Sequence, residues 1–120
     1  MPEKQYSRLI IRKDGAITRI EFLDRNIIEE ANIQQIGDEI TSLIDSAAVP
    51  KLLISFDNVE HLSSAALGTL ITINNRVRQK GGQLRLSNIN PQIYEAFVIT
   101  KLNKLFQIHD NAESAVISFK

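Results

Sequence analysis

The sequence contains no cysteine, and aromatic residues make up only 6% of it. A chain without cysteine forms no disulfide scaffold and carries no thiol chemistry. The small number of aromatic side chains argues against a platform on which nucleic-acid bases stack. Net charge is absent as well, because 14 lysine and arginine residues balance 14 aspartate and glutamate residues. Since no overall positive field would attract nucleic acid, we expect no nucleic-acid partner.

Long apolar runs are missing too. No uninterrupted run approaches the roughly 18 residues of a membrane-spanning helix, and the N-terminal segment lacks the apolar stretch of a signal peptide. We therefore expect a cytoplasmic protein with no membrane partner. The length of 120 residues, with 43% hydrophobic and 23% charged residues, is typical of one globular domain. We expect that domain to span residues 1–120, with its core within residues 7–118.

Hydrophobic patterning in the first half of the chain predicts a hairpin followed by a helix. Residues 7–12 and 16–23 are rich in apolar side chains, and Asp14-Gly15 between them is a strong signal for a tight turn. Apolar residues then recur at helical spacing before Pro50, and Asn32 is the expected N-cap. The predicted helix has one apolar stripe, formed by Ile33, Ile36, Ile40, Leu43 and Ile44.

The middle of the chain predicts a β-α-β unit with a right-handed crossover. Residues 52–56 are a nearly continuous apolar run, typical of a strand buried on both faces. A long helix follows over residues 64–80 and ends at Gly81-Gly82. Residues 83–88 then alternate like a strand with one buried face. In that strand we expect Leu84 and Leu86 to point inward, and Arg85 and Ser87 to point outward.

The C-terminal third predicts two more helices around a short strand. Pro91 is well placed to open a helix at its first turn. A loop and a short strand near Ile108 come next, and residues 111–119 form the last helix. The fold class is therefore α/β, with one mixed sheet of four to five strands and covering helices. In the helix at Pro91, the residues expected to face the core are Ile93, Phe97 and Val98.

The junction between the central strand and the long helix is the candidate site. In α/β folds, ligands and partners bind in the crevice beyond the carboxyl ends of the strands. Here two adjacent hydroxyls, on Ser63 and Ser64, are followed by the small residues Ala65, Ala66 and Gly68. Small side chains leave the backbone and the hydroxyls open to a bulky partner.

Two roles are open for this serine pair. Free N–H groups and the helix dipole favour an anion at a helix start, so a phosphate on Ser64 would be tolerated there. It would add about −1.5 to −2 charges to an otherwise small and apolar surface. The alternative is that one serine simply caps the helix. The two roles can coexist, one for each serine.

Other sites are weaker in this sequence. The only histidines, His61 and His109, lie far apart, and no spacing of acidic residues suggests a metal site. A serine hydrolase built on Ser64 lacks the Gly-x-Ser-x-Gly elbow, and no phosphate-binding glycine loop occurs. Asp57 is either a turn residue or a polar neighbour of the serines. We interpret Arg76, Arg78 and Lys80 as a solvated basic helix end in preference to a site for a specific anion.

An ordered set of motifs runs through most of the chain. An apolar strand ends at Asp57, and Ser63-Ser64-Ala65-Ala66-Leu67-Gly68 follows after a few residues. Gly81-Gly82 precedes the next strand, and Asn90-Pro91-Gln92-Ile93 opens a helix. Within residues 99–106, the last motif is the Leu-x-x-Leu stretch from Leu102 to Leu105. In order and spacing, the chain resembles the STAS domains of bacterial anti-sigma factor antagonists.

The resemblance implies a regulatory protein with no catalytic residue, metal or cofactor. In the implied cycle, the unphosphorylated domain binds an anti-sigma factor, often a serine kinase, and so frees a sigma factor for transcription. Phosphorylation by the kinase ends the binding, and a serine phosphatase restores it. The phosphoacceptor of the family falls on Ser64, with Ser63 as the alternative. The partner-binding surface is then expected to comprise Asp57, Asn58, His61, Leu62, Ser63, Ala65, Ala66, Leu67 and Gly68.

A second hypothesis is a STAS scaffold that binds its partners constitutively. It is motivated by Ser63, which stands where the family has an aspartate just before the phosphoacceptor. For either hypothesis we expect a monomer or a weak dimer.

Overall fold

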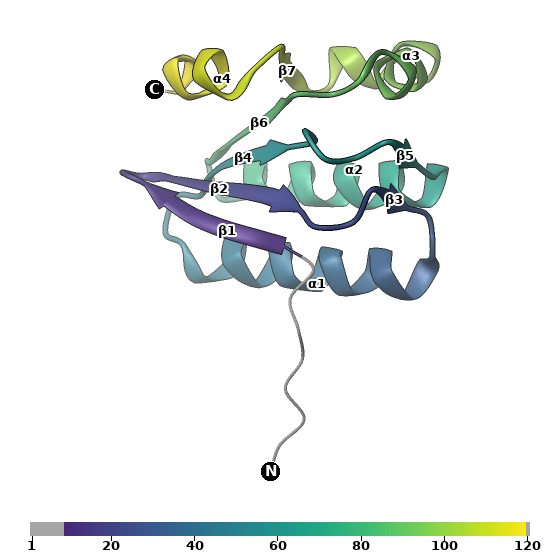
Figure 1. Ribbon diagram of the computed structural model, residues 1–120. Coiled ribbons are helices and arrows are strands. Elements are labelled where there is room, and N and C mark those ends of the chain that lie inside the picture. The colour runs from purple at the N-terminus through teal and green to yellow at the C-terminus, as the bar shows by residue number, and fades with distance from the viewer. Residues whose placement is uncertain (1–8, 120) are drawn as a thin grey trace.

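The computed structural model describes residues 9–119, which form a five-stranded sheet with helices on both faces (Figure 1). The strand order is β1-β2-β4-β6-β7. Strands β1 and β2 pair antiparallel, and every other neighbouring pair is parallel, so the sheet is mixed. The predicted α/β fold class and strand number are confirmed. The strands are β1 (Leu9–Asp14), β2 (Ile17–Phe22), β4 (Lys51–Ser55), β6 (Gln83–Ser87) and β7 (Gln107–His109).

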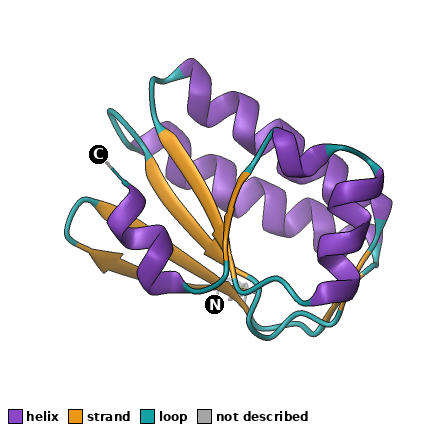
Figure 2. Cartoon of the chain, turned by 90° about the horizontal axis from the view of Figure 1, so that it is seen from above, coloured by secondary structure: helices purple, strands orange, loops and turns teal. Residues whose placement is uncertain are grey.

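Four helices cover the sheet. Figure 1 shows α1 (Glu30–Ser46) and α2 (Ser64–Gln79) side by side on one face. Figure 2 shows the helices in purple from above. The two shorter ones are α3 (Pro91–Ile99) and α4 (Ala112–Ser118). A single 3-10 turn, η1 (Leu102–Lys104), leads from α3 to β7. Within the described residues, no helix is both long enough and apolar enough to cross a lipid bilayer.

The predicted hairpin is present. Strand β1 begins at Leu9, and the Ser7 end of the predicted strand lies outside the described residues. Gly15 lies in the two-residue turn to β2 with a φ of +62°, a conformation that glycine adopts without strain. The hairpin register places Leu9 opposite Phe22 and Ile11 opposite Ile20. Since side chains alternate along a strand, these two pairs share the face that α1 and α2 cover.

The apolar stripe of α1 is confirmed, but its predicted start is wrong. Ile33, Ile36, Ile40 and Ile44 are all buried. The helix begins at Glu30 and its N-cap is Glu29, so Asn32 lies inside the first turn. The Asn32 amide donates to the Glu29 carboxylate over 3.4 Å instead of capping the backbone.

Close packing of α1 on α2 depends on Gly37. A Cβ atom at this position would lie 3.0 Å from the Thr69 methyl group. The glycine therefore lets the two helices approach each other, which accounts for a residue that costs helix stability.

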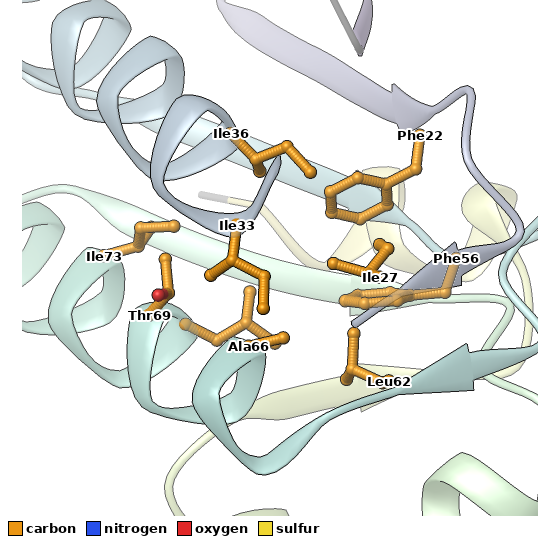
Figure 3. A pocket seen from close by; sticks show the side chains of 10 residues that line it. Phe22, Ile27, Ile33, Ile36, Phe56, Leu62, Ala66, Thr69 and Ile73 are labelled. Atoms are coloured by element: carbon orange, nitrogen blue, oxygen red, sulfur yellow. The ribbon is translucent and has the colours of Figure 1, made fainter. Parts of the chain in front are cut away.

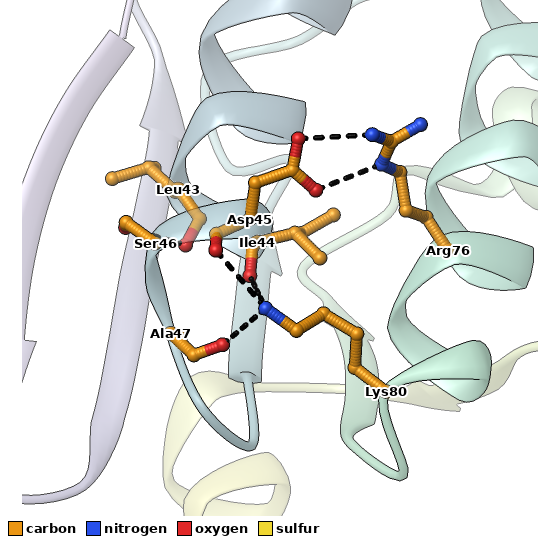
Figure 4. Close-up of polar contacts among 7 residues, drawn as sticks. All are labelled: Leu43, Ile44, Asp45, Ser46, Ala47, Arg76 and Lys80. Atoms are coloured by element: carbon orange, nitrogen blue, oxygen red, sulfur yellow. Dashed lines mark hydrogen bonds and ion pairs between the residues drawn. The ribbon is translucent and has the colours of Figure 1, made fainter.

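The far ends of the helix pair are joined by polar contacts (Figure 4). Asp45 accepts two hydrogen bonds of 2.9 Å from the Arg76 guanidinium. This side-chain hydrogen bond, more than the charge of Arg76, lowers the pKa of the Asp45 carboxyl group. The Lys80 ammonium donates to the backbone oxygens of Ile44 and Asp45, both at 3.0 Å, and to that of Ala47. Lysine thus binds carbonyl groups of the last turn of α1, of which the Ile44 oxygen also accepts from the Ala47 N–H over 3.2 Å.

The predicted end of the long helix is also confirmed. Gly81 has a φ of +70°, and the Gly82 N–H donates to the Val77 oxygen over 2.9 Å. This is the left-handed glycine termination expected from Gly81-Gly82.

On the opposite face of the sheet, two residues of β6 that were expected to point outward are buried. Leu84 and Leu86 point into the main core as expected. Arg85 and Ser87 occupy the other face, yet they are only 7% and 0% exposed. Helix α4 causes this burial, because its Ala115 packs against Ile17 and Leu53 on the same face.

In α3, one of the three residues predicted to face the core is not buried. Ile93 and Phe97 are buried at a spacing of one helical turn, as predicted. Val98 is 44% exposed, because the next position along the helix is rotated by about 100° from that buried face.

Candidate functional site

The loop between β4 and α2 is held in place by a two-stranded ladder that sequence patterning did not predict. Strand β3 (Asn26–Ile27) pairs parallel with β5 (His61–Leu62). The N–H groups of Glu60 and His61 donate to the Arg25 oxygen over 2.7 and 3.1 Å, and the Ser63 N–H donates to the Ile27 oxygen over 3.1 Å. The chain therefore enters α2 from a fixed backbone position.

Contacts from the other side complete this support. The Asn90 amide donates to the oxygens of Val59 and Glu60, both at 3.2 Å, and its Oδ1 accepts from the Ile93 N–H at the start of α3. Val59 is only 3% exposed and anchors the loop in the core. One asparagine thus caps α3 and ties that helix to the loop that precedes α2.

The two serines at the start of α2 have different environments. Ser63 is the N-cap, and its Oγ accepts a hydrogen bond of 3.2 Å from the Ala66 N–H. Ser64 is the first residue of the helix, and it is exposed. Across residues 9–119, its hydroxyl group has no hydrogen-bond partner. Capping therefore occupies Ser63 and leaves the Ser64 hydroxyl available.

The start of α2 also favours a negative charge. The Ala66 N–H is taken by the cap, and the N–H groups of Ser64 and Ala65 precede the first possible intrahelical bond. The first turn contains no acidic side chain. A phosphate group on Ser64 would meet the positive end of the helix and two free N–H donors there.

The structure also tests whether the residues of the predicted partner surface can reach a partner. Leu62 and Ser63 are half-buried. Ala66 and Leu67 are only 4% and 8% exposed, because these side chains point to the core side of α2. Their place in the partner surface stays a prediction, and their side chains are not accessible in this structure. The exposed members are Asp57, Asn58, His61, Ala65 and Gly68.

Sequence reasoning missed the part of this surface that comes from β3 and its flanks. Ile28 is 53% exposed directly after β3, and Leu23 is 51% exposed directly after β2. The Leu23 oxygen accepts a hydrogen bond of 3.0 Å from the Asn58 amide, which joins the two segments. Leu23 ends the predicted strand 16–23 and Ile28 lies in no predicted element, so neither gave a signal of exposure, because single apolar residues are usually core.

A small apolar void lies beneath the start of α2 (Figure 3). Its volume is about 10 Å³, roughly that of one water molecule. Phe22, Phe56 and Leu62 line one side and the helices line the other. The void is a packing gap and has no room for a substrate.

A larger groove runs between α1 and α2 on the outer side, with a volume of about 520 Å³. It starts beside Ala65 and continues past Gly37 and Thr72. Its acidic side chains, Glu30 and Asp38, both belong to α1. The groove therefore extends the exposed surface from Ser64 along the helix pair.

The two histidines do not share a hydrogen-bond network with Ser64 in the described part of the chain. His61 is exposed on β5, and His109 ends β7 at the sheet edge. Among the described residues, no hydrogen bond joins either histidine to Ser64, and no three metal-binding side chains cluster. Neither histidine is therefore positioned by a hydrogen bond to Ser64 as the base of a nucleophile pair would be.

Known proteins share this fold and much of this sequence pattern. The STAS domain family model matches residues 9–115. BtrV of Bordetella bronchiseptica, named as a candidate anti-sigma factor antagonist, is 24% identical over 96 residues, which are 80% of this chain and 82% of BtrV. An anti-sigma-factor antagonist (STAS) domain protein of Planctomyces limnophilus superposes with a TM-score of 0.83 at 18% identity, covering 92% of this chain and 96% of that chain. SpoIIAA of Bacillus in its phosphorylated form gives a TM-score of 0.71 at 17% identity, covering 91% and 96%. The chain belongs to the STAS domain family.

Proposed function

We propose that this protein is a cytoplasmic anti-sigma factor antagonist that is switched by phosphorylation of Ser64. The names of BtrV and of the Planctomyces limnophilus protein support the first part of the proposal. A phosphorylated form of the structural relative SpoIIAA supports the second part. In this role the protein is a binding module and a kinase substrate, and it is not an enzyme.

The observation that carries the proposal is the division of roles between the two serines. Because Ser63 supplies the cap, Ser64 is free to react without loss of the first turn of α2. Phosphorylation replaces a neutral hydroxyl with about −1.5 to −2 charges. The domain stays folded, and an exposed surface that was neutral at its centre becomes anionic.

The docking surface comprises Ser64 with its exposed neighbours Asp57, Asn58, His61, Ala65 and Gly68, and it continues into the α1–α2 groove. Small side chains at Ala65 and Gly68 let a partner approach the helix backbone closely. The proposed partner is an anti-sigma factor of the serine-kinase type, and a serine phosphatase reverses the modification. A charge at Ser64 would have to be desolvated when this surface is covered, so phosphorylation opposes binding.

The test is phosphorylation by the cognate anti-sigma kinase with ATP, followed by mass spectrometry of the wild type, Ser64→Ala and Ser63→Ala. We expect one phosphate on the wild type and on Ser63→Ala, and none on Ser64→Ala. Binding to the kinase is then measured for Ser64→Ala and Ser64→Asp, and we expect only Ser64→Asp to lose affinity. A wild-type chain that takes up no phosphate at either serine would refute the switch.

A constitutive STAS scaffold is the second candidate. It is favoured by Ser63, where the family has an aspartate and this chain has an uncharged cap. The scaffold predicts that Ser64→Ala and Ser64→Asp bind a partner as tightly as the wild type does. Sedimentation of the purified chain would test the expected monomer or weak dimer in either case.

A further inference from the structure

The groove between α1 and α2 has two walls of different chemistry. Each wall is one helical stripe, because residues three or four positions apart share a face of a helix. The stripe on α1 is polar and includes Glu30, Gln34 and Asp38. The stripe on α2 has small and hydroxyl side chains and includes Ala65, Thr69 and Thr72. A molecule in the groove would therefore meet a different surface on each side.

Charge is divided unequally between the two helices. Helix α1 contains four acidic residues and no lysine or arginine. In α2, residues 64–75 include no charged side chain, and the first charged residue is Arg76. Arg76 does not line the groove, and it is already paired with Asp45. The groove therefore lies between an acidic wall and an uncharged one.

Asp38 is the acidic side chain of this wall that helix stability does not explain. Glu30 lies in the first turn of α1, where a carboxylate interacts favourably with the helix dipole. Asp38 lies in the middle of the helix, where the dipole gives no such benefit and aspartate is a weak helix former. It is exposed, and within residues 9–119 its carboxylate makes no ion pair or hydrogen bond. The groove thus contains an accessible negative charge that has no counter-ion in the described chain.

We propose that this groove binds a basic amphipathic helix of a partner protein. A third helix can lie along a pair of helices and pack its side chains into the groove between them. Charge complementarity orients this helix in the groove. Its lysine or arginine side chains face Glu30 and Asp38 on α1, and its small or apolar side chains face Ala65 and Thr69 on α2.

The contact at Asp38 does not depend on the charge of Ser64. Asp38 lies about two turns beyond Glu30, or roughly 12 Å at the rise of an α-helix. Ser64 lies at the end of the groove where both helices begin. Exposed charges further apart than the Debye length, which is about 8 Å at physiological salt, are largely screened from each other. The groove can therefore bind this helix whether or not Ser64 is phosphorylated.

The test is a nuclear magnetic resonance titration of the isotopically labelled protein with a synthetic amphipathic peptide. The peptide has about 14 residues, enough for a marginally stable helix, with leucine along one face and lysine beside it. A matched peptide has glutamine in place of lysine. With the lysine peptide we expect saturable shifts of the backbone N–H groups of Gly37, Thr69 and Thr72, and an affinity that falls as the salt concentration rises. The glutamine peptide should bind more weakly.

Asp38→Asn should weaken binding of the lysine peptide about threefold, the effect of one exposed ion pair. Asp38→Lys should weaken it about tenfold, because repulsion replaces attraction. Glu95→Lys is the matched control, since Glu95 is an exposed carboxylate in the middle of α3, which contributes no residue to the groove. It should leave the affinity unchanged. Three results would overturn the proposal: no saturable shift of the groove N–H groups, equal affinity for the lysine and glutamine peptides, or equal weakening by Asp38→Lys and Glu95→Lys.

Discussion

The two ends of the α1–α2 layer are held together in different ways. At the end where both helices terminate, Lys80 binds three carbonyl oxygens of α1, and Arg76 pairs with Asp45 (Figure 4). At the end where they begin, the Glu29 side chain makes no cap bond, and an apolar void lies between α1 and α2 beside Ala66 and Ile33 (Figure 3). Polar side chains thus cross between the helices at one end, and a groove separates them at the other.

This difference separates stability from recognition along one pair of helices. The terminating end joins α1 to α2 through charged side chains. The beginning end has exposed small residues and one unpaired hydroxyl group, which a partner can reach. Substitutions at the first end should therefore change the free energy of unfolding most, and substitutions at the second should change binding and affect folding less.

The largest effect is expected for Gly82→Ala. A Cβ atom at Gly82 would lie 2.2 Å from the Pro50 oxygen, which is backbone and cannot move without β4. We expect a loss of about 3 kcal/mol of unfolding free energy, at the upper end of overpacking effects. Gly68→Ala is the control at the other end of α2, since its Cβ would meet nothing within 4 Å. It should stabilise by about 1 kcal/mol, and chemical denaturation measures both.

Lys80→Met should have the next largest effect. Methionine keeps most of the apolar stem but removes the ammonium group that binds the end of α1. Because the freed carbonyls regain some water, we expect a loss of about 2 kcal/mol, within the range for hydrogen bonds to charged groups. A loss no larger than that of an ordinary surface substitution would show that this contact does not hold the helices together.

Ser63→Ala and Ser64→Ala test the division of roles at the start of α2. Loss of the cap in Ser63→Ala should cost about 1 kcal/mol. Ser64→Ala removes an exposed hydroxyl that makes no hydrogen bond within the described chain, so its effect should stay within about 0.5 kcal/mol. Equal losses in thermal denaturation would contradict the assignment of the cap to Ser63.

The smallest effect is expected for Asp45→Asn, and it should depend on pH. The pKa of Asp45 is lowered in the folded chain by its hydrogen bond with Arg76. Its contribution is therefore present above the unfolded pKa of about 4 and is lost as the pH falls through the folded value. Stability of the wild type and the variant should differ slightly at pH 7 and converge at strongly acidic pH. A difference that grows on acidification would contradict this ion pair.

Strongly periodic segments could be predicted from sequence because each carries its own signal. The stripe of α1, the apolar run of β4 and the glycines after α2 are local patterns, and all three are confirmed. The β3–β5 ladder has no such signal, because two strands of two residues each carry no measurable period. Arg85 illustrates another limit. A polar residue in an alternating strand normally faces water, and only the docking of α4 buries it.

The start of α2 was predictable from the sequence, but the separate roles of its two serines were not. A serine pair between a strand and a helix indicates a helix start, whichever serine is the cap. Distinguishing Ser63 from Ser64 requires the hydrogen bond to the Ala66 N–H, which depends on the backbone angle at which the chain enters α2. The burial of Ala66 and Leu67 likewise follows from the orientation of α2 on the sheet.

The β3–β5 ladder has a consequence for the kinetics of recognition. Backbone bonds to Arg25 and Ile27 and side-chain bonds from Asn90 immobilise the loop before any partner arrives. The conformational entropy of this loop is therefore lost during folding and not during association. Docking then resembles the meeting of two rigid bodies, and a change of charge on Ser64 should act mainly on how long the complex lasts.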